Sequence, residues 1–317
     1  MFFSKSWNPD GKHVYVTGGS TGLGLSVSIL LVKKGAHVSI VARNQEKLDK
    51  ALETLEEHRT SPSQKILAYS YSLLSAEDSE KAYKAVCAGH DGRAPDAVFN
   101  CAGASKPMFF VEMTKEDLEQ GMANSFWIEA WTAWIAAKEM VRQGVKGKIV
   151  FVSSTLGYMT FVGWANYAPG RHALRGLGDT LASELRLYDI GVHTFFPPTM
   201  VTASYVEENK TKPEITKAIE GTDDGLTSEQ AAAVLLRGEF SESGVEKGQS
   251  HITGDWITSS FRASTRGATP MNNWVIDSLW NFFALFAIPI WRRTVEYQID
   301  AHKADHMEHL RKIGFLH

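Results

Sequence analysis

Short apolar runs alternate with segments of helical spacing along the first 260 residues of the chain. The apolar runs have the length of strands and are rich in β-branched and aromatic residues. They are His13–Thr17, His37–Ala42, Ile66–Tyr71, Ala97–Asn100, Lys148–Ser153, Gly191–Phe196 and Ser250–Ile257. The segments with helical spacing between them include Leu25–Lys34, Gln45–His58, Ser79–Ala88 and Thr114–Met140. This alternation predicts an α/β fold, with a doubly wound parallel sheet of about seven strands and helices on both faces.

The pattern changes near residue 272, where a continuous apolar stretch, Trp274–Trp291, begins. It has about the minimum length of a membrane span, yet it contains Asp277 and Pro289, and two arginines follow it. A membrane-embedded or interfacial helix, an oligomer interface and ordinary core are all compatible with this pattern. A charged helical tail, Tyr297–His317, completes an extension that we predict over residues 261–317, beyond a domain over residues 1–260. Its three histidines share one helical face, but histidine is common on solvated faces, so we predict no metal site.

Composition narrows the class of protein. The 317-residue chain carries 33 basic and 36 acidic residues, and this net charge of -3 gives no support for a nucleic-acid surface. The length suits one large α/β domain with an extension. Cys87 and Cys101 form no CxxC pattern, which suits a reducing compartment.

A glycine-rich loop follows the first strand directly and leads into a helical segment. Glycines allow a tight turn and a close approach to a pyrophosphate, and the helix start offers unpaired N–H groups. We therefore predict the Rossmann arrangement, with cofactor contacts at Gly18, Ser20, Thr21, Gly22 and Gly24. The same residues contain G-x-S-x-G, the pattern of a hydrolase nucleophile elbow. Its place on the first strand argues against that alternative.

The end of the second strand indicates which nicotinamide cofactor binds. Arg43 ends this strand and Lys47 follows four residues later. An acidic residue here would bind a ribose hydroxyl, whereas basic residues accommodate a 2′-phosphate. The pair therefore favours NADPH over NADH, although a solvated pair at the start of a helix is the alternative.

Residues 153–177 carry the candidate chemistry. The fifth strand brings Ser153 and Ser154 to the carboxyl edge of the sheet, where ligands bind in open α/β folds. Tyr167 and Arg171 are spaced i and i+4 and share one helical face. A phenol can protonate a carbonyl oxygen, and a nearby cation lowers the phenol pKa. Ser154 is suited to hydrogen-bond the same oxygen.

The glycine loop, Asn100-Cys101-Ala102-Gly103, Ser154 and Tyr167 together resemble the short-chain dehydrogenase/reductase family over roughly residues 10–260. This resemblance implies a catalytic role for Asn124. It also implies cofactor contacts at Ser72, Asn100, Ala102, Gly103, Tyr167, Arg171, Pro197, Thr199 and Met200. The chain departs from the family at Arg171, where the family has lysine, and at Ser72, where it has aspartate. Because arginine cannot relay a proton, we hypothesise slower ketone reduction than in a lysine version.

Further stretches are similar to 3-ketodihydrosphingosine reductases, especially fungal ones. They are the segment ENKTKPEITKAIE (Glu208–Glu220), the Pro197-Pro198 pair, the Arg43/Lys47 pair and the apolar C-terminal stretch. The resemblance implies NADPH-dependent reduction of 3-ketosphinganine, a long-chain keto-amine, to sphinganine. It further implies a location at the endoplasmic reticulum membrane with the catalytic domain facing the cytosol. The charged segment after the sixth strand is too long for a simple turn, so we predict a substrate lid at about residues 203–225.

Two alternatives stay open at the level of sequence. One is another lipid, steroid or retinoid carbonyl reductase of the same family. The other is a catalytically impaired NADPH-binding protein, because Arg171 replaces the family lysine. Separately, a tryptophan stripe (Trp127, Trp131 and Trp134) predicts core or subunit packing, and we expect a homo-oligomer, a dimer or a tetramer.

Overall fold

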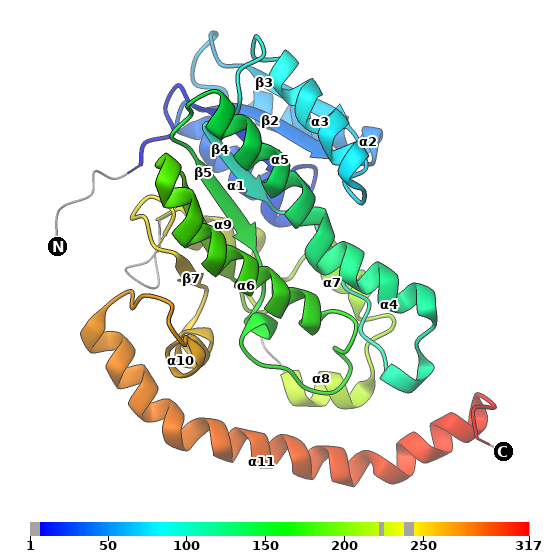
Figure 1. The fold of residues 1–317 in the computed structure, drawn as a ribbon. Coiled ribbons are helices and arrows are strands. Elements are labelled where there is room, and N and C mark those ends of the chain that lie inside the picture. Colours follow the sequence, from blue (N-terminus) through cyan, green and yellow to red (C-terminus); the bar gives the residue numbers. More distant parts are fainter. Residues whose placement is uncertain (1–6, 222–224, 238–243, 317) are drawn as a thin grey trace.

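The computed structural model describes residues 7–221, 225–237 and 244–316. Within these residues the strands form one seven-stranded sheet in the order β3-β2-β1-β4-β5-β6-β7, and every neighbouring pair is parallel (Figure 1). The strands are β1 (His13–Thr17), β2 (His37–Ala42), β3 (Ile66–Ser70), β4 (Ala97–Asn100), β5 (Lys148–Val152), β6 (Gly191–Phe196) and β7 (His251–Thr253). The predicted doubly wound α/β fold is confirmed. Residues 222–224 of the predicted lid lie outside the described residues.

Helices cover both faces of this sheet. The main ones are α1 (Gly22–Lys33), α2 (Gln45–Glu56), α3 (Ala76–Ala88), α4 (Lys115–Met122), α5 (Ile128–Arg142), α6 (Ala168–Glu184) and α9 (Ser228–Arg237). Val14 and Val16 pack with α1, α2 and α9 on one face, whereas Tyr15 between them packs with α3 and α5 on the other. Side chains alternate along a strand, so a sheet buried on both faces needs this continuous apolar sequence.

The predicted helical segment Thr114–Met140 differs in detail. Its first helix, α4, begins after Thr114, whose hydroxyl accepts a hydrogen bond from the Asp117 N–H at 3.2 Å. The long helical segment that follows is interrupted by a π-helical turn, Ala123–Trp127, between α4 and α5. The tryptophan stripe does not enter the core of this chain, since Trp127 is 40% and Trp134 51% exposed. Subunit packing is therefore the alternative that remains for it.

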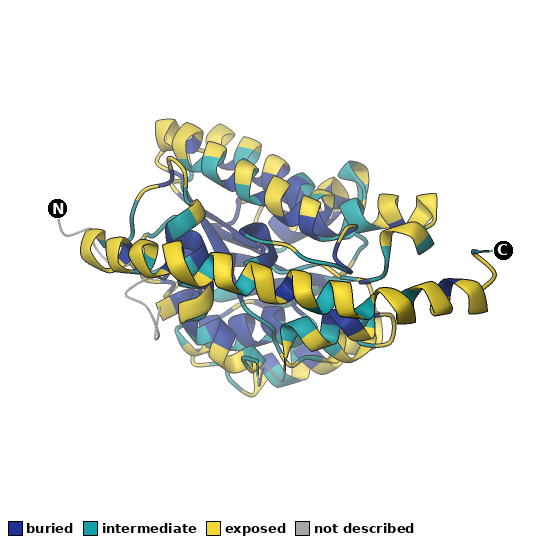
Figure 2. Ribbon diagram, turned by 90° about the horizontal axis from the view of Figure 1, so that it is seen from below, coloured by how far each residue is buried: buried dark blue, intermediate teal, exposed yellow. Residues whose placement is uncertain are grey.

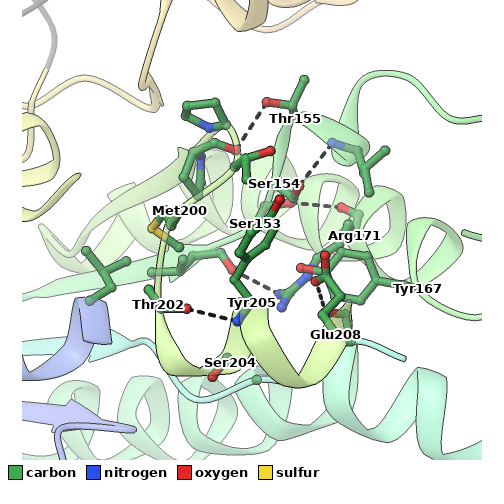
Figure 3. A pocket seen from close by; sticks show the side chains of 18 of the residues that line it. Ser153, Ser154, Thr155, Tyr167, Arg171, Met200, Thr202, Ser204, Tyr205 and Glu208 are labelled. Carbon is green, nitrogen blue, oxygen red and sulfur yellow. Dashed lines mark hydrogen bonds between the residues drawn. The ribbon is translucent and has the colours of Figure 1, made fainter. Parts of the chain in front are cut away.

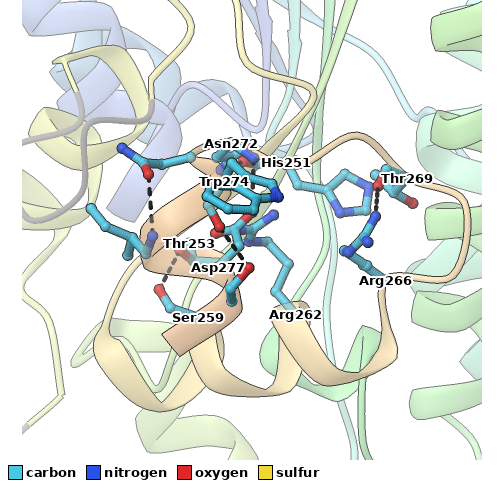
Figure 4. Close-up of polar contacts among 12 residues, drawn as sticks. His251, Thr253, Ser259, Arg262, Arg266, Thr269, Asn272, Trp274 and Asp277 are labelled. Carbon is cyan, nitrogen blue, oxygen red and sulfur yellow. Dashed lines mark hydrogen bonds and ion pairs between the residues drawn. The ribbon is translucent and has the colours of Figure 1, made fainter. Parts of the chain in front are cut away.

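The C-terminal extension is a short helix, α10 (Trp256–Thr265), followed by a long one, α11 (Trp274–Lys312). Figure 1 shows α11 crossing below the carboxyl edge of the sheet, and Figure 2 shows it lying along the body of the molecule. A buried ion pair between Arg262 and Asp277 joins the two helices (Figure 4). The Asn272 side-chain amide also donates to the carbonyl of His251 at 2.8 Å. The extension is thus attached to the last strand.

Most of the surface of α11 stays exposed (Figure 2). By length and composition it is the one helix in the described part of the chain that could cross a membrane, with a mean hydropathy of 1.4 over an 18-residue window. Ordinary core, one of the predicted alternatives, is therefore not its environment. At its far end, His306 packs on Phe109 and His309 hydrogen-bonds Glu112 at 2.7 Å. Among the described residues no group of side chains is arranged to hold a metal ion.

Candidate active site

A cavity of about 750 Å³ opens at the carboxyl edge of the sheet. It lies beside β1 and β4, where the strand order reverses, which is the usual ligand site of this architecture. The predicted site residues that line it are Gly18, Ser20, Thr21, Gly22, Gly24, Arg43, Lys47, Ala102, Gly103, Asn124, Ser153, Ser154, Tyr167, Arg171, Pro197, Thr199 and Met200. The carboxyl edge of the sheet thus brings together residues that are far apart in the sequence.

Two predicted cofactor residues lie elsewhere. Asn100 is buried in β4, and its side-chain amide donates to the carbonyl of Val150 at 3.1 Å. The Ser72 hydroxyl accepts from the N–H of Leu74 at 3.4 Å, and its neighbour Tyr71 lines the cavity in its place. Contacts of Ser72 and Asn100 with the cofactor stay predictions.

The glycine loop fits the pyrophosphate of a dinucleotide. Gly18 has a φ of +64°, and a Cβ there would lie 2.9 Å from the Cα of Ala102. A Cβ on Gly24 would lie 2.4 Å from the Gly18 carbonyl oxygen. Thr21 precedes α1 without capping it through its side chain, and the first turn holds no acidic residue. The first N–H groups of α1 therefore remain for an anion, as a dinucleotide requires.

The end of β2 contributes the basic wall of the cavity. Arg43 and Lys47 both line it, together with Asn44. The Asn44 side chain accepts from the N–H of Lys47 at 2.8 Å, which starts α2 at this point. The Ser70 hydroxyl donates to the carbonyl of Arg43 at 3.0 Å and fixes the backbone there.

The two serines after β5 have different tasks (Figure 3). Ser153 is buried, and its hydroxyl donates to the carbonyl of Arg171 at 3.2 Å, which ties β5 to α6. The Ser154 hydroxyl accepts from the N–H of Leu156 at 3.2 Å. This bond uses a lone pair and leaves the hydroxyl hydrogen of Ser154 for a ligand. Ser154 is thus the serine suited to hold a substrate oxygen.

Arg171 has a buried partner that the sequence analysis did not identify. Its Nη1 donates to Glu129 Oε1 at 2.6 Å and to the Val152 carbonyl at 2.9 Å. Glu129 Oε2 in turn accepts from the Val152 N–H at 3.0 Å. The Arg171 side chain is 5% exposed and the Glu129 side chain 1%. A lone acid inside an apolar, tryptophan-rich run was the available signal for Glu129, since a buried charge needs a partner.

The same guanidinium lies over the ring of Tyr167, 4.8 Å from its centroid. Its Nε is buried and has no hydrogen-bond partner among the described residues. A cofactor with hydroxyl groups fits such an orphaned donor. Arg171 therefore faces both the phenol and the cavity.

Two opposing effects set the pKa of Tyr167. Burial raises it above the ordinary value of a phenol, and the Arg171 cation opposes this rise without cancelling it. The cation thus lowers the pKa as expected, but burial has the larger effect, because the half-buried ring loses hydration that one cation does not replace. The phenol therefore keeps its proton at neutral pH and is a proton donor. Burial likewise raises the pKa of Glu129 to about 7 against the effect of Arg171.

Asn124 lies in the π-helical turn and lines the cavity. Its side-chain amide donates to the carbonyl of Gln120 at 2.9 Å, in the preceding turn. Its main-chain carbonyl oxygen would lie 3.2 Å from a Cβ on Gly103. The catalytic role of Asn124 stays a prediction.

Two short helices cover the cavity from the side of β6. They are α7 (Ala203–Glu208) and α8 (Glu214–Glu220), within the segment predicted as a lid. Glu208, Lys212 and Glu220 of this segment line the cavity as well. The sequence analysis assigned these three side chains no individual role.

Comparisons with known proteins agree with this geometry. The short chain dehydrogenase family model matches residues 12–213. The chain is 40% identical over 314 residues to the 3-ketodihydrosphingosine reductase TSC10 of Cryptococcus neoformans var. neoformans serotype D (strain B-3501A), covering 99% of this chain and 92% of that protein. It is 32% identical over 228 residues to the 3-ketodihydrosphingosine reductase of Mus musculus, covering 72% of this chain and 68% of that protein. A solved short-chain type dehydrogenase/reductase from Mycobacterium ulcerans superposes with a TM-score of 0.64 at 24% identity, covering 78% of this chain and 90% of that chain.

The chain therefore belongs to the short-chain dehydrogenase family. Within that family, it is similar over nearly its whole length to fungal proteins named 3-ketodihydrosphingosine reductase. Both resemblances drawn from the sequence are confirmed. Family membership makes the chain an oxidoreductase that uses a nicotinamide cofactor, and it removes the support for a hydrolase built on Ser20.

Proposed function

We propose that this chain reduces 3-ketosphinganine to sphinganine with NADPH. The observation that carries the proposal is the extent of the cavity, which runs from Tyr167 to apolar residues of the C-terminal extension. Phe261, Ala284, Ile288 and Trp291 line that far part. A polar reacting end and an apolar far end match a long-chain keto-amine. The names of the similar fungal and mouse proteins support the same substrate.

The residues of the site perform the proton half of the reduction. The Ser154 hydroxyl donates a hydrogen bond to the ketone oxygen and holds it beside Tyr167. A nicotinamide cofactor held by the glycine loop and Arg171 would supply the hydride that the carbonyl carbon needs. Tyr167 transfers its phenolic proton to the oxygen, which completes the alcohol, and the Arg171 cation stabilises the phenolate that remains. A proton from solvent then restores the phenol.

NADPH rather than NADH is proposed from the basic wall at the end of β2. Arg43 offers a planar donor fork for a 2′-phosphate and Lys47 adds a point charge. Arg43→Ala is expected to raise KM for NADPH roughly tenfold or more, because hydrogen bonds to charged groups contribute about 1.5–3 kcal/mol. KM for NADH should change little. An equal effect on both cofactors would contradict this assignment.

The remaining organisation is proposed on the same basis. We assign the reductase domain to residues 1–260, the lid to about residues 203–225 and a membrane-associating extension to residues 261–317. The exposed apolar face of α11 supports association with the endoplasmic reticulum membrane, with the catalytic domain in the cytosol. The tryptophan stripe, which runs from the π-helical turn into α5 and is exposed at Trp127 and Trp134, supports a homo-oligomer.

The decisive experiment follows NADPH oxidation by the full chain with 3-ketosphinganine, retinal and steroid ketones. We expect 3-ketosphinganine to give the highest kcat/KM. Tyr167→Phe should lower kcat about 10²–10⁴-fold, the usual contribution of a positioned proton donor. Tyr188→Phe, at an exposed tyrosine away from the cavity, is the matched control. A preference for retinal or steroids would point to another carbonyl reductase. Cofactor binding without turnover would point to an impaired enzyme.

A further inference from the structure

A compact group of charged and aromatic side chains lies under the lid. Lys212 Nζ lies 2.6 Å from Glu208 Oε1 and 2.6 Å from Glu220 Oε2, and its side chain is 1% exposed. The ammonium is also 5.1 Å from the ring centroids of Trp164 and Tyr205. All five residues line the same cavity as Tyr167.

The charges of this group do not balance. Two carboxylates share one ammonium, so one negative charge remains at the wall of the cavity when both are ionised. Burial raises the pKa of Glu220 in spite of its bond to Lys212. Burial alone would lower the pKa of Lys212, but its bonds to Glu208 and Glu220 raise it, so the lysine stays charged. A cation from outside would complete the neutralisation, because an uncompensated charge is costly in a confined site.

Glu208 is the carboxylate of the group that lies beside the reacting residues (Figure 3). Figure 3 shows its side chain beside Tyr167 and Arg171. One of its oxygens binds Lys212 and the other accepts from the Ser105 hydroxyl. An ionised carboxylate offers about four acceptor positions, so Glu208 retains capacity for a further donor. Its negative charge also acts on the phenol of Tyr167.

Glu220 is less suited to accept a further hydrogen-bond donor from a ligand. One of its oxygens binds Lys212 and the other accepts from the indole N–H of Trp164 at 3.1 Å. Trp164 in turn packs between this carboxylate and Tyr167, with 5.5 Å between the two aromatic ring centroids. Glu220 therefore holds the lid and the lysine in place.

We propose that Glu208 binds the protonated amine of an α-amino ketone and so selects substrates with a cation next to the reacting carbonyl. The inference rests on the proposed function, and it names the group that recognises the head of the substrate. An ammonium on the carbon beside the ketone reaches Glu208 while the carbonyl oxygen lies at Ser154 and Tyr167. Ketones without this amine lose the contact, which separates this enzyme from reductases of neutral ketones.

The test compares two substrates on two enzymes. The substrates are 3-ketosphinganine and a long-chain 1-hydroxy-3-ketone that lacks only the amine, and the enzymes are the wild type and Glu208→Gln. The variant keeps the shape and removes the charge. We expect it to raise KM for 3-ketosphinganine roughly 10- to 100-fold, the range of a hydrogen bond between charged groups, with a smaller change in kcat. KM for the ketone without the amine should stay within about twofold.

Glu207→Gln is the matched control, because Glu207 is the adjacent residue on α7 and pairs only with Lys210 at the surface among the described residues. Melting temperature and NADPH binding are measured on each protein to detect a disturbed lid. An equal loss of activity on both substrates would overturn the inference and assign Glu208 a structural role. An unchanged KM for 3-ketosphinganine would overturn it too. A wild type that does not reduce 3-ketosphinganine would instead contradict the proposed function itself.

Discussion

At the scale of single residues, the site depends on how Arg171 is held. Its guanidinium bridges Glu129, the Val152 carbonyl and the face of Tyr167. Removing both charges of the buried pair from water costs free energy that their attraction offsets only in part. The raised pKa of Glu129 expresses that cost. The pair is therefore best explained as a device that positions the cation beside the phenol.

The stability contribution of Glu129 should depend on pH. Its pKa rises from 4.5 in the unfolded chain to about 7 in the folded one. The folded state thus holds this proton more tightly, so stability falls as pH rises from about 5 to about 7, by up to about 3 kcal/mol. Glu129→Gln cannot lose this proton. Urea unfolding should therefore show the variant gaining stability relative to the wild type between pH 5 and pH 8.

Glu139→Gln, which removes a surface partner of Arg142, is the control for that titration, and its effect should stay within about 1 kcal/mol at both pH values. A stability difference between wild type and Glu129→Gln that does not change with pH would contradict the raised pKa.

The sequence-based hypothesis predicts that Arg171→Lys raises turnover. The structure leads us to expect the opposite, because a lysine has one nitrogen and cannot keep the contacts to Glu129 and Val152 while facing Tyr167. We expect kcat to fall roughly tenfold, close to the loss of one hydrogen bond to a charged group. Steady-state kinetics measure this change in kcat, and a titration with NADPH checks that the variant still binds the cofactor. Faster turnover by the lysine variant would restore the hypothesis of an impaired enzyme.

At the scale of elements, local pattern predicted most of the fold. The first six strands and the glycine loop follow from neighbouring residues, and they appear where expected. The seventh strand is shorter than the predicted Ser250–Ile257, because α10 already begins at Trp256.

The contacts that the sequence did not predict join distant segments. Glu129 meets Arg171 because α6 packs against the π-helical turn that leads into α5. Glu208 meets Ser105 only after the lid folds over the cavity. Such pairings depend on how the elements pack in three dimensions, and the hydrophobic periodicity of the sequence does not predict this packing.

The docking of α11 gives an element-scale prediction. Asp277 accepts from Arg262 and from the N–H of Asn272 at 2.9 Å, and both charged side chains are 3% exposed. Asp277→Asn leaves the Arg262 charge buried without a partner, which costs about 3–5 kcal/mol. We expect α11 to separate from α10, with faster amide exchange in both helices and little change in β1–β6. Hydrogen exchange followed by mass spectrometry resolves this difference.

Asp300→Asn is the control, since Asp300 pairs with Lys303 at the exposed part of the same helix. Uniformly faster exchange across the sheet would show that Asp277 supports the whole domain instead of the docking of one helix.

At the scale of the whole molecule, α11 connects the cavity to the outer surface. One side of the helix lines the cavity through Ala284, Ala287 and Trp291. The other side exposes large apolar residues such as Phe282 and Phe286, and Arg292 follows. A helix that contacts the body in this way lies along it, so the proposed membrane association leads us to expect insertion in the membrane plane instead of a perpendicular span. The cavity would then open close to the lipid that supplies its substrate.

This arrangement predicts that exposed side chains of α11 control membrane binding. The double variant Phe282→Glu/Phe286→Glu places two charges on the exposed face without touching the cavity lining. We expect it to float poorly with phosphatidylcholine–phosphatidylserine vesicles, because each buried aromatic side chain contributes about 1.5–3 kcal/mol. Its turnover of 3-ketosphinganine dispersed in detergent should match that of the wild type. Leu187→Glu, at an exposed apolar residue beyond α6, should leave flotation unchanged. If instead the double variant still floats and loses turnover, the face packs against protein and α11 is an oligomer interface.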